Sequence, residues 1–152
     1  MRIRIQFLDP ENIKEVEVLQ SMILSFYTDY ETDRIMTPDK IQSTITHLHQ
    51  HPEAGCMLLI MDDDIIAGYA ILINFWSNEF GGTILFTDEL FIKEEYRNRG
   101  IGRQFFQLAE EKFKEAKILA LELSPSNHKA ARLYQKLGFV SNKNTTLFKM
   151  LG

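Results

Sequence analysis

Three apolar, β-prone segments joined by very short connections occupy the middle of the chain, and they constrain the fold more than any other feature. The segments are residues 56–61, 65–75 and 83–93. An acidic connection at 62–64 separates the first two, and a polar stretch ending in two glycines at 81–82 precedes the third. A parallel strand pair needs a crossover of about a dozen residues or more, whereas short turns join antiparallel strands. The sequence therefore predicts three adjacent antiparallel strands.

The residues before this region predict one strand and two helices. Residues 3–7 alternate apolar with polar side chains, which predicts an opening strand. Asp9-Pro10 and Thr37-Pro38 each resemble an N-cap followed by the first helical residue, and apolar residues recur at helical spacing after both. The first part of the chain therefore predicts the order β-α-α.

After the three strands, the hydrophobic period returns to that of a helix. Residues 101–116 carry apolar side chains at helical spacing, and 118–123 form a short apolar strand. A further helix ends at Gly138, a position that fits a left-handed C-terminal residue. Residues 139–150 predict a closing hairpin with its turn at 142–144.

Together these patterns predict an α/β (α+β) chain with the element order β-α-α-β-β-β-α-β-α-β-β. The sheet is expected to be mixed and mostly antiparallel, with about seven strands flanked by about four helices. No repeat, low-complexity tract or linker interrupts the pattern. A chain of 152 residues is also long enough to bury a substantial core. We therefore expect a single domain over residues 1–152.

Composition and charge disfavour several classes of protein. The formal net charge is −4, whereas a nucleic-acid-binding surface normally shows a basic excess. No apolar run approaches the ~18 residues that a membrane-spanning helix needs. Residues 1–7 lack the continuous apolar stretch of a signal peptide, so a cytoplasmic protein is expected. Cys56, the single cysteine, stands in an apolar segment and is expected to be a small core residue. We expect neither a membrane nor a nucleic acid as a partner.

A short loop between a strand and a helix carries the strongest sign of chemistry. The strand over 83–93 leads into the run RNRGIG at 97–102, where a helix begins. Backbone N–H groups at a helix N-terminus form an anion site, and glycines let phosphate oxygens approach the backbone. Arg97, Arg99 and Arg103 add positive charge to this segment of an acidic chain. The run therefore predicts a phosphate site, and the alternative is a helix start that binds nothing.

Two familiar nucleotide motifs do not fit this loop. A P-loop ends in Gly-Lys-Ser/Thr, whereas Gly102 is followed by Arg103-Gln104. A dinucleotide fingerprint needs a small residue three positions after its second glycine, and Phe105 stands there. A phosphate-bearing ligand of another class is therefore expected.

The loop and a second pattern further along the chain together resemble one enzyme family. Arg97-x-x-Gly100-x-Gly102 resembles the Arg/Gln-x-x-Gly-x-Gly/Ala signature of the GNAT superfamily of N-acetyltransferases. Residues 127–139, NHKAARLYQKLGF, resemble its second pattern, on the next strand–helix unit. The resemblance is specific over 83–140 and rests on element order alone in the first half of the chain. It implies a GNAT-like fold in which two central strands splay apart and hold acyl-CoA between them.

The resemblance implies acetyl-CoA as the co-substrate. In this family, backbone groups of the splayed strand meet the pantetheine arm, and main-chain N–H groups of the loop hold the pyrophosphate. Asn127 would hydrogen-bond the cofactor, and Ala130 would leave room for it. The residues implied in cofactor binding are Leu90, Phe91, Ile92, Arg97, Asn98, Arg99, Gly100, Ile101, Gly102, Arg103, Asn127 and Ala130.

One tyrosine and two carboxylates are expected in catalysis. An amine that attacks a thioester expels a thiolate, which a positioned phenol can protonate. The resemblance gives that role to Tyr134, and the alternative is a core tyrosine. An amine with a pKa of about 10 arrives protonated and needs a base.

Asp88 and Glu89 are the predicted bases, because an unpaired carboxylate in an apolar strand is costly. Alternation is expected to direct them to opposite faces of the sheet. The segment resembles the polyamine N-acetyltransferases, and this similarity places Asp88 at their acidic catalytic position. Two alternatives stay open: Glu89 acting through a water molecule, and an ion pair with a lysine or arginine for the carboxylate that faces away.

Two segments are expected near the acyl acceptor. Asp29, Glu31 and Asp33 lie between the first two helices, a region that shapes the acceptor pocket in this superfamily. Residues 74–80, NFWSNEF, approach the same region from another loop. An acidic, aromatic pocket would suit a cationic amine, and the alternative is a solvated acidic loop beside an aromatic turn.

The predicted function is transfer of an acetyl group from acetyl-CoA to a primary amine by direct attack in a ternary complex. The acceptor is a small polyamine-like molecule or a protein amino group. The alternative is a non-catalytic acyl-CoA-binding sensor or interaction module. His47 and His51 stand one helical turn apart, but histidines also complement a helix C-terminus, and no metal is expected. A homodimer is expected by analogy, because dimers are common in the superfamily.

Overall fold

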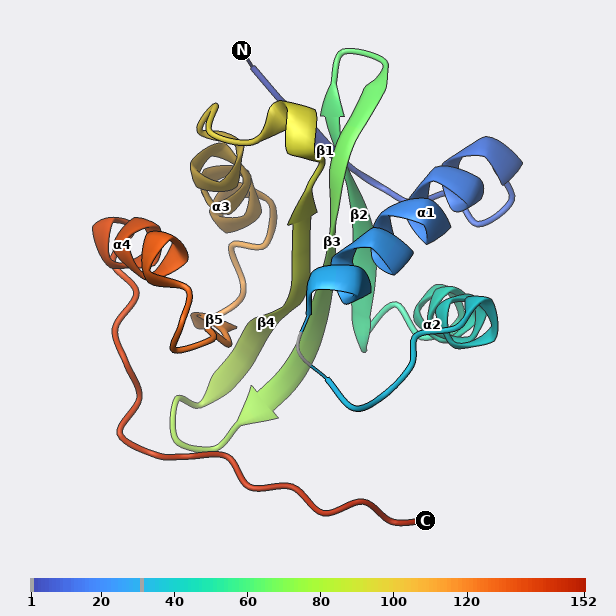
Figure 1. Cartoon of the computed structure of the whole chain (residues 1–152). Helices are drawn as coiled ribbons and strands as arrows, with labels where there is room; N and C mark the ends of the chain where they lie inside the picture. Colours follow the sequence, from blue (N-terminus) through green and yellow to red (C-terminus); the bar gives the residue numbers. More distant parts are fainter. Residues whose placement is uncertain (1, 31) are drawn as a thin grey trace. The chain divides into compact units, whose positions relative to one another are not determined.

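The computed structural model describes residues 2–30 and 32–152 (Figure 1). Its backbone contacts divide into two compact units, Met1–Glu122 and Leu123–Gly152. Glu31, expected near the acceptor, lies outside the described residues.

The first unit is built on a sheet whose strands follow the chain order. The described residues form five strands, with β1 to β4 antiparallel to their neighbours and β5 parallel to β4. The predicted antiparallel run of three strands is confirmed, and Asp63 adopts a positive φ of 51° in the tight β2–β3 turn. The strands are β1 (Arg4–Phe7), β2 (Gly55–Asp62), β3 (Ile65–Ser77), β4 (Gly82–Ile92) and β5 (Ile118–Leu121).

Helices cover both faces of this sheet, with α1 (Ile13–Asp29) and α2 (Pro38–Gln50) on one face and α3 (Ile101–Lys112) on the other (Figure 1). A short 3₁₀ helix, η1 (Glu94–Tyr96), connects β4 to the loop before α3. The described helices include none that is long and apolar enough to cross a membrane.

Side-chain caps set the starts of α1 and α2. Thr37 caps α2 by accepting from the N–H of Lys40, with Pro38 as the first helical residue, as predicted. The expected cap at Asp9-Pro10 is wrong, because Asn12 caps α1 instead. Asp9 forms a turn before the helix, in which its carboxylate accepts from the N–H of Glu11.

The core lies between the sheet and the pair α1–α2. Its buried members come from both helices and from three strands, and they include Leu19, Met22, Ile23, Ile41, Ile45, Leu48, Met57, Leu59, Met61, Tyr69, Ile71 and Phe91. Helix α3 buries a second apolar face on the opposite side, where Phe105 and Phe106 are almost wholly enclosed. The apolar periodicity seen in the sequence therefore marks the buried faces.

Truncating a core leucine should destabilise the first unit far more than truncating an exposed one. Leu59 is wholly buried on β2, so we expect Leu59→Ala to lower the free energy of unfolding by about 2–5 kcal/mol. Leu24 on α1 is 40% exposed, and Leu24→Ala should change it by less than about 0.5 kcal/mol. Urea unfolding followed by circular dichroism measures both, and similar losses in the two variants would contradict this core.

The second unit holds a single described helix, α4 (His128–Lys136), followed by an extended tail. Asn127 caps α4 by accepting from the N–H of Ala130 at 3.1 Å. Gly138 adopts a φ of 93°, which confirms the predicted left-handed residue after the helix.

The predicted closing hairpin is wrong for this structure. Residues 139–141 and 145–150 form no strand, so the described residues contain five strands rather than about seven. Val140, Leu147 and Phe148 remain largely exposed, at 92%, 89% and 76%. An isolated two-stranded hairpin is marginal in water, and β-propensity expresses itself only when side chains are packed against a neighbour.

Candidate active site

Strand β4 carries a β-bulge at its two acidic residues. Thr87 pairs with Leu72 and Glu89 pairs with Ile71, so Asp88 is an extra residue without a partner in this ladder. Adjacent residues of β3 point to opposite faces, and their partners Thr87 and Glu89 therefore do so as well. The bulge therefore interrupts, at Asp88, the regular alternation on which the expected opposite orientation of Asp88 and Glu89 was based.

The bulge turns Glu89 toward the face of the sheet that α1 covers. Tyr27 of α1 donates its hydroxyl to Oε2 of Glu89 at 2.6 Å, and Tyr69 of β3 donates to Oε1 at 2.7 Å. Glu89 is 8% exposed, and Tyr69 is wholly buried. One alternative left open by the sequence was an ion pair with a lysine or arginine for the carboxylate that faces away from the site. The hydrogen-bond partners of Glu89 are instead two phenols.

The ionisation of Glu89 is shaped by opposing effects. Desolvation raises the pKa of Glu89, the hydroxyls of Tyr27 and Tyr69 lower it, and the charge of Asp88 raises it again. The net shift in the pKa of Glu89 is upward.

Asp88 is exposed at the bulge, in contrast to its neighbour. Desolvation and the nearby charge of Glu122 raise the pKa of Asp88 above its ordinary value. A carboxylate with a raised pKa that reaches solvent can accept a proton from an incoming group.

The pairing between β4 and β5 is short. It runs from Ile84 with Ile118 to Thr87 with Leu121, and β4 then continues to Ile92 without β5 beside it. Leu90, Phe91 and Ile92, the residues expected to meet the pantetheine arm, stand in this stretch. The pattern fits the splay that the resemblance implies, because amides beyond the ladder need another partner.

The loop after η1 presents the N-terminus of α3. Asn98 and Gly100 adopt positive φ angles of 63° and 77°, and Gly100 is the N-cap residue. Within the described chain, no side chain caps this end by a hydrogen bond. A Cβ at Gly100 would meet no described heavy atom within 4 Å, so the space beside the N-cap is open. These features fit a phosphate group, because the first amides of a helix lack partners within it.

Two arginines of the loop lie against aromatic rings. The Nε of Arg97 donates to the carbonyl of Ile92 at 2.8 Å, and its guanidinium lies 5.4 Å from the ring centre of Phe91. Arg99 lies 5.6 Å from the ring centre of Tyr96. Both side chains therefore hold the loop that leads into α3 against β4 and η1.

Three predicted residues lie in the second unit. Asn127 uses its side-chain oxygen to cap α4 at the N–H of Ala130, a structural role beside the expected contact with cofactor. Tyr134 is half-buried, and burial raises the pKa of its hydroxyl. Its ring packs edge-on against Phe139 at 5.7 Å.

The segments expected near the acceptor are exposed. Asp29 and Asp33 point to solvent, and Trp76 near the β3–β4 turn is 72% exposed. Aromatic rings do gather at the end of α1, where Tyr27 and Tyr30 each lie within 5.5 Å of Phe26. The sequence did not predict a role at the site for Tyr27 or Tyr69, whose only sign was a polar hydroxyl on an otherwise apolar face.

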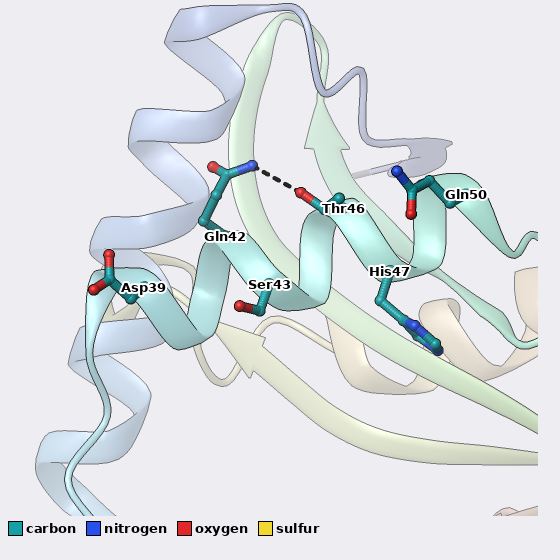
Figure 2. Close-up of a pocket in the computed structure, with 6 residues that line it drawn as sticks. All are labelled: Asp39, Gln42, Ser43, Thr46, His47 and Gln50. Carbon is teal, nitrogen blue, oxygen red and sulfur yellow. Dashed lines mark hydrogen bonds between the residues drawn. The ribbon is translucent and has the colours of Figure 1, made fainter.

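The polar hollow along α2 is the outer face of one helix. Figure 2 shows its lining side chains, which are Asp39, Gln42, Ser43, Thr46, His47 and Gln50. They recur at helical spacing, and Gln42 donates to Thr46 at 3.3 Å. No second element contributes a lining residue among those described, so this hollow is a solvated face.

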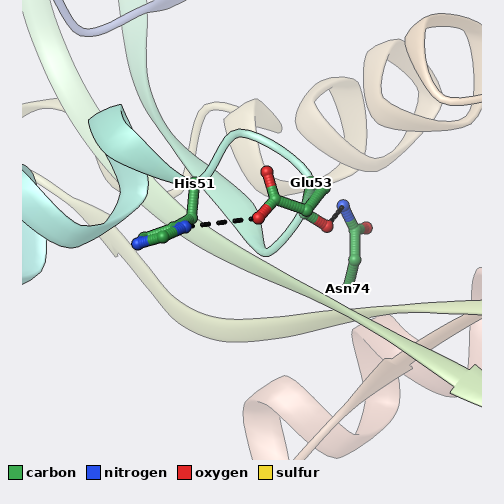
Figure 3. Close-up of polar contacts among 3 residues, drawn as sticks. All are labelled: His51, Glu53 and Asn74. Carbon is green, nitrogen blue, oxygen red and sulfur yellow. Dashed lines mark hydrogen bonds and ion pairs between the residues drawn. The ribbon is translucent and has the colours of Figure 1, made fainter.

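The histidines at the end of α2 take part in local contacts. The rings of His47 and His51 lie 4.9 Å apart, and Nδ1 of His51 is 3.4 Å from a carboxylate oxygen of Glu53. Figure 3 shows this pair together with Asn74, which donates to the carbonyl of Glu53. In the part of the chain that the structure describes, no group of three or more potential metal ligands gathers.

Solved structures with the same fold cover nearly the whole chain. A possible acetyltransferase from Clostridium difficile 630 is 16% identical, with a TM-score of 0.81 and 99% of each chain covered. AAC(6')-Iy, solved with the bisubstrate analog CoA-S-monomethyl-acetylneamine, is 15% identical, with a TM-score of 0.78 and both chains fully covered at 100%. The ribosomal-protein-alanine N-acetyltransferase from Brucella melitensis biovar Abortus 2308 is 16% identical, with a TM-score of 0.73 and 98% and 100% covered. At these identities the likeness shows the fold alone.

Sequence comparison identifies the family. No curated protein sequence matches the chain. The family model described as "Acetyltransferase (GNAT) family" matches residues 18–139, which is most of the chain and includes parts of both units. The chain therefore belongs to the GNAT family of acetyltransferases.

Proposed function

We propose that this enzyme transfers the acetyl group of acetyl-CoA to a primary amine by direct attack in a ternary complex. One observation carries the proposal: β4 presents two carboxylates at a bulge and then leads into the open N-terminus of α3. A proton acceptor and an anion site thus stand at two points of one strand–loop–helix unit. The family match supports the same chemistry.

The cofactor would be held mainly by backbone groups. The amides at 98–103 would bind the pyrophosphate at the positive end of α3, with the charges of Arg97 and Arg99 nearby. The stretch of β4 beyond its ladder with β5, Leu90 to Ile92, would meet the pantetheine amides. The roles of Asn127 and Ala130 rest on the family resemblance.

The reaction needs a base, an oxyanion contact and an acid. Asp88 would take a proton from the ammonium of the acceptor, since it is exposed and its raised pKa suits that task. The free amine would then attack the thioester carbonyl, and the N–H of Leu90 would stabilise the oxyanion. When the C–S bond breaks, Tyr134 would protonate the departing thiolate, and the second proton lost by the attacking nitrogen would restore the phenol.

No covalent acyl-enzyme step is part of the proposal. Burial raises the pKa of the Cys56 thiol to about 11, so the thiol stays protonated near neutral pH and is a poor nucleophile. Glu89 would act differently from Asp88, as a fixed negative charge that attracts the cationic acceptor.

The proposal treats residues 1–152 as one cytoplasmic N-acetyltransferase domain that acts without a metal. The family match includes residues of both units, which supports the proposal that they belong to one domain. A homodimer remains part of the proposal by analogy with the family. The acceptor is a small amine or a protein amino group, and the name of one neighbour, a ribosomal-protein-alanine N-acetyltransferase, supports keeping the second class.

An amine panel with free thiol as the readout tests this function. Acetyl-CoA would be supplied with monoamines, polyamines and peptides with free amino groups. We expect thiol release that depends on both enzyme and amine, and a product heavier by one acetyl group. Tight binding of acetyl-CoA with no turnover across the panel would instead favour an acyl-CoA sensor.

Adding a methyl group at Gly100 should weaken acetyl-CoA binding. A residue with a side chain at a φ of 77° costs roughly 1–2 kcal/mol in strain, and its Cβ would enter the open space beside the α3 N-cap. We expect Gly100→Ala to raise the Kd for acetyl-CoA about tenfold or more, measured by calorimetry.

Gly81→Ala is the matched control for this experiment. Gly81 has a similar φ of 65°, and a Cβ there would also meet no described atom within 4 Å. The control should lose similar stability and keep its affinity. Equal losses of acetyl-CoA affinity in both variants would contradict the proposal that this loop binds the cofactor.

A further inference from the structure

Glu89 is held by two phenols that come from different elements. Tyr27 of α1 donates to one carboxylate oxygen at 2.6 Å, and Tyr69 of β3 donates to the other at 2.7 Å. These distances match hydrogen bonds to a charged oxygen, which are about 2.5–2.7 Å long. An ionised carboxylate can accept at both oxygens, whereas a carboxylic acid would need one of its contacts to take its own proton. One phenol at each oxygen of Glu89 is therefore an arrangement that favours the ionised form.

Burial opposes that ionised state. Glu89 is 8% exposed, and its pKa is raised first by desolvation and also by the charge of Asp88. In the described chain, the groups that act on Glu89 are Asp88, Tyr27 and Tyr69, and none of them is a cation. The two hydroxyls are thus what favours the anion against desolvation.

Both phenols keep their protons in the working range of pH. Desolvation is the main cause that raises the pKa of Tyr27 and of Tyr69, and the charge of Glu89 raises both further. Asp88 also raises both, and Tyr30 contributes at Tyr27. Because neither phenol ionises near neutral pH, both remain donors to Glu89.

We propose that Tyr27 and Tyr69 are positioning residues that keep Glu89 ionised and fixed, so that it serves as the counter-charge for the ammonium form of the acceptor. The inference rests on the proposed function of the enzyme as an amine acetyltransferase. It divides the work between two neighbouring carboxylates. Exposed Asp88 receives the proton, and buried Glu89 stays an anion throughout the reaction.

Removing either hydroxyl should make Glu89 harder to ionise. We expect Tyr69→Phe and Tyr27→Phe each to raise the pKa of Glu89 by about one to two pH units. Carbon-13 NMR of protein labelled at glutamate carboxyls measures this titration in the enzyme alone, with Glu89→Gln to assign the signal. Tyr30→Phe is the matched control: its ring packs on Tyr27 and Phe26, whereas the two hydroxyls on Glu89 belong to Tyr27 and Tyr69.

Kinetics on an amine from the panel give a second readout. At a pH where Glu89 is protonated in the variants but ionised in the wild type, KM for the cationic amine should rise about tenfold in each, because raising the pKa of Glu89 by one unit lowers its ionised fraction by up to about tenfold. At higher pH, still below the pKa of the amine, KM should return to the wild-type value. The kcat and the affinity for acetyl-CoA should change little, and Tyr30→Phe should match the wild type throughout.

The possible outcomes distinguish the role of Tyr27 and Tyr69 at Glu89 from the proposed function on which that role rests. An unchanged titration of Glu89 in both variants would overturn the inference. So would a rise in KM that persists at every pH, because a purely structural defect would not recover. If the wild type acetylates no amine, the proposed function fails, while the titration still decides whether the two tyrosines hold Glu89 ionised.

Discussion

Replacing Tyr134 with phenylalanine should lower kcat for acetyl transfer by about 10²–10⁴-fold, the usual range for loss of a general acid. Burial raises the pKa of the Tyr134 hydroxyl, which keeps it protonated and able to donate to the departing thiolate. The ring that packs against Phe139 is retained in the variant, so the second unit should keep its structure. Acetyl-CoA affinity should stay close to that of the wild type.

Single-turnover kinetics decide whether this loss belongs to the chemical step. The wild type and Tyr134→Phe would be mixed with saturating acetyl-CoA and amine, and acetyl transfer followed directly. Tyr30→Phe, which removes a hydroxyl from the exposed end of α1, should match the wild type. A chemical step in Tyr134→Phe within about twofold of the wild type would assign the proton to another donor.

Substitutions of the two carboxylates of β4 should change different kinetic constants. We expect Asp88→Asn to lower kcat by about 10²-fold or more, because the exposed base is lost. In the wild type, the pKa of Asp88 is raised above its ordinary value. A plot of kcat against pH should therefore rise as Asp88 ionises, at a pH above the ordinary range of an aspartate. The variant should lack this rise.

Glu89→Gln should act mainly on binding of the acceptor. The substitution removes the buried negative charge while keeping the size of the side chain, so KM for a cationic amine should rise about tenfold or more, with a smaller change in kcat. Steady-state kinetics across pH compare the two variants. If kcat falls mainly in Glu89→Gln and KM rises mainly in Asp88→Asn, the two roles must be exchanged.

Features set by neighbours in sequence could be predicted well. The antiparallel run of β2 to β4 follows from connections too short for any other pairing. The cap of α2 at Thr37 was predicted from the Thr-Pro pair at 37–38. The left-handed residue after α4 was predicted from the glycine at position 138. The loop before α3 belongs to this group as well, because its glycine and its helix start lie within a few residues of each other.

Features set by distant contacts could not be predicted. The partners of Glu89 are 62 and 20 positions away, and no local pattern marks Tyr27 or Tyr69 as hydrogen-bond donors. The bulge at Asp88 depends on the register between β3 and β4, which alternation alone does not reveal. The tail after residue 138 shows the opposite error, since its β-prone composition forms no strand in the structure.

The hydrogen bonds from Tyr27 and Tyr69 to Glu89 distinguish this residue from its neighbour Asp88. From sequence, Asp88 and Glu89 were two adjacent carboxylates in an apolar strand, and only the family resemblance distinguished them, by placing Asp88 at the acidic catalytic position. The structure makes them unlike, since one is exposed at the bulge and the other is enclosed by two phenols. A difference in environment between adjacent titratable groups is what lets them perform different tasks.

Titration of nitrogen-15-labelled enzyme with acetyl-CoA, followed by amide NMR, shows whether acetyl-CoA binds at the N-terminus of α3 and along β4. We predict saturable shifts that are largest at the amides of Gly100, Ile101 and Gly102 and at Leu90 to Ile92 on β4. In Gly100→Ala the same shifts should need a higher ligand concentration, and in Gly81→Ala they should not. No binding, or shifts confined to residues away from this loop and strand, would contradict the acetyl-CoA site.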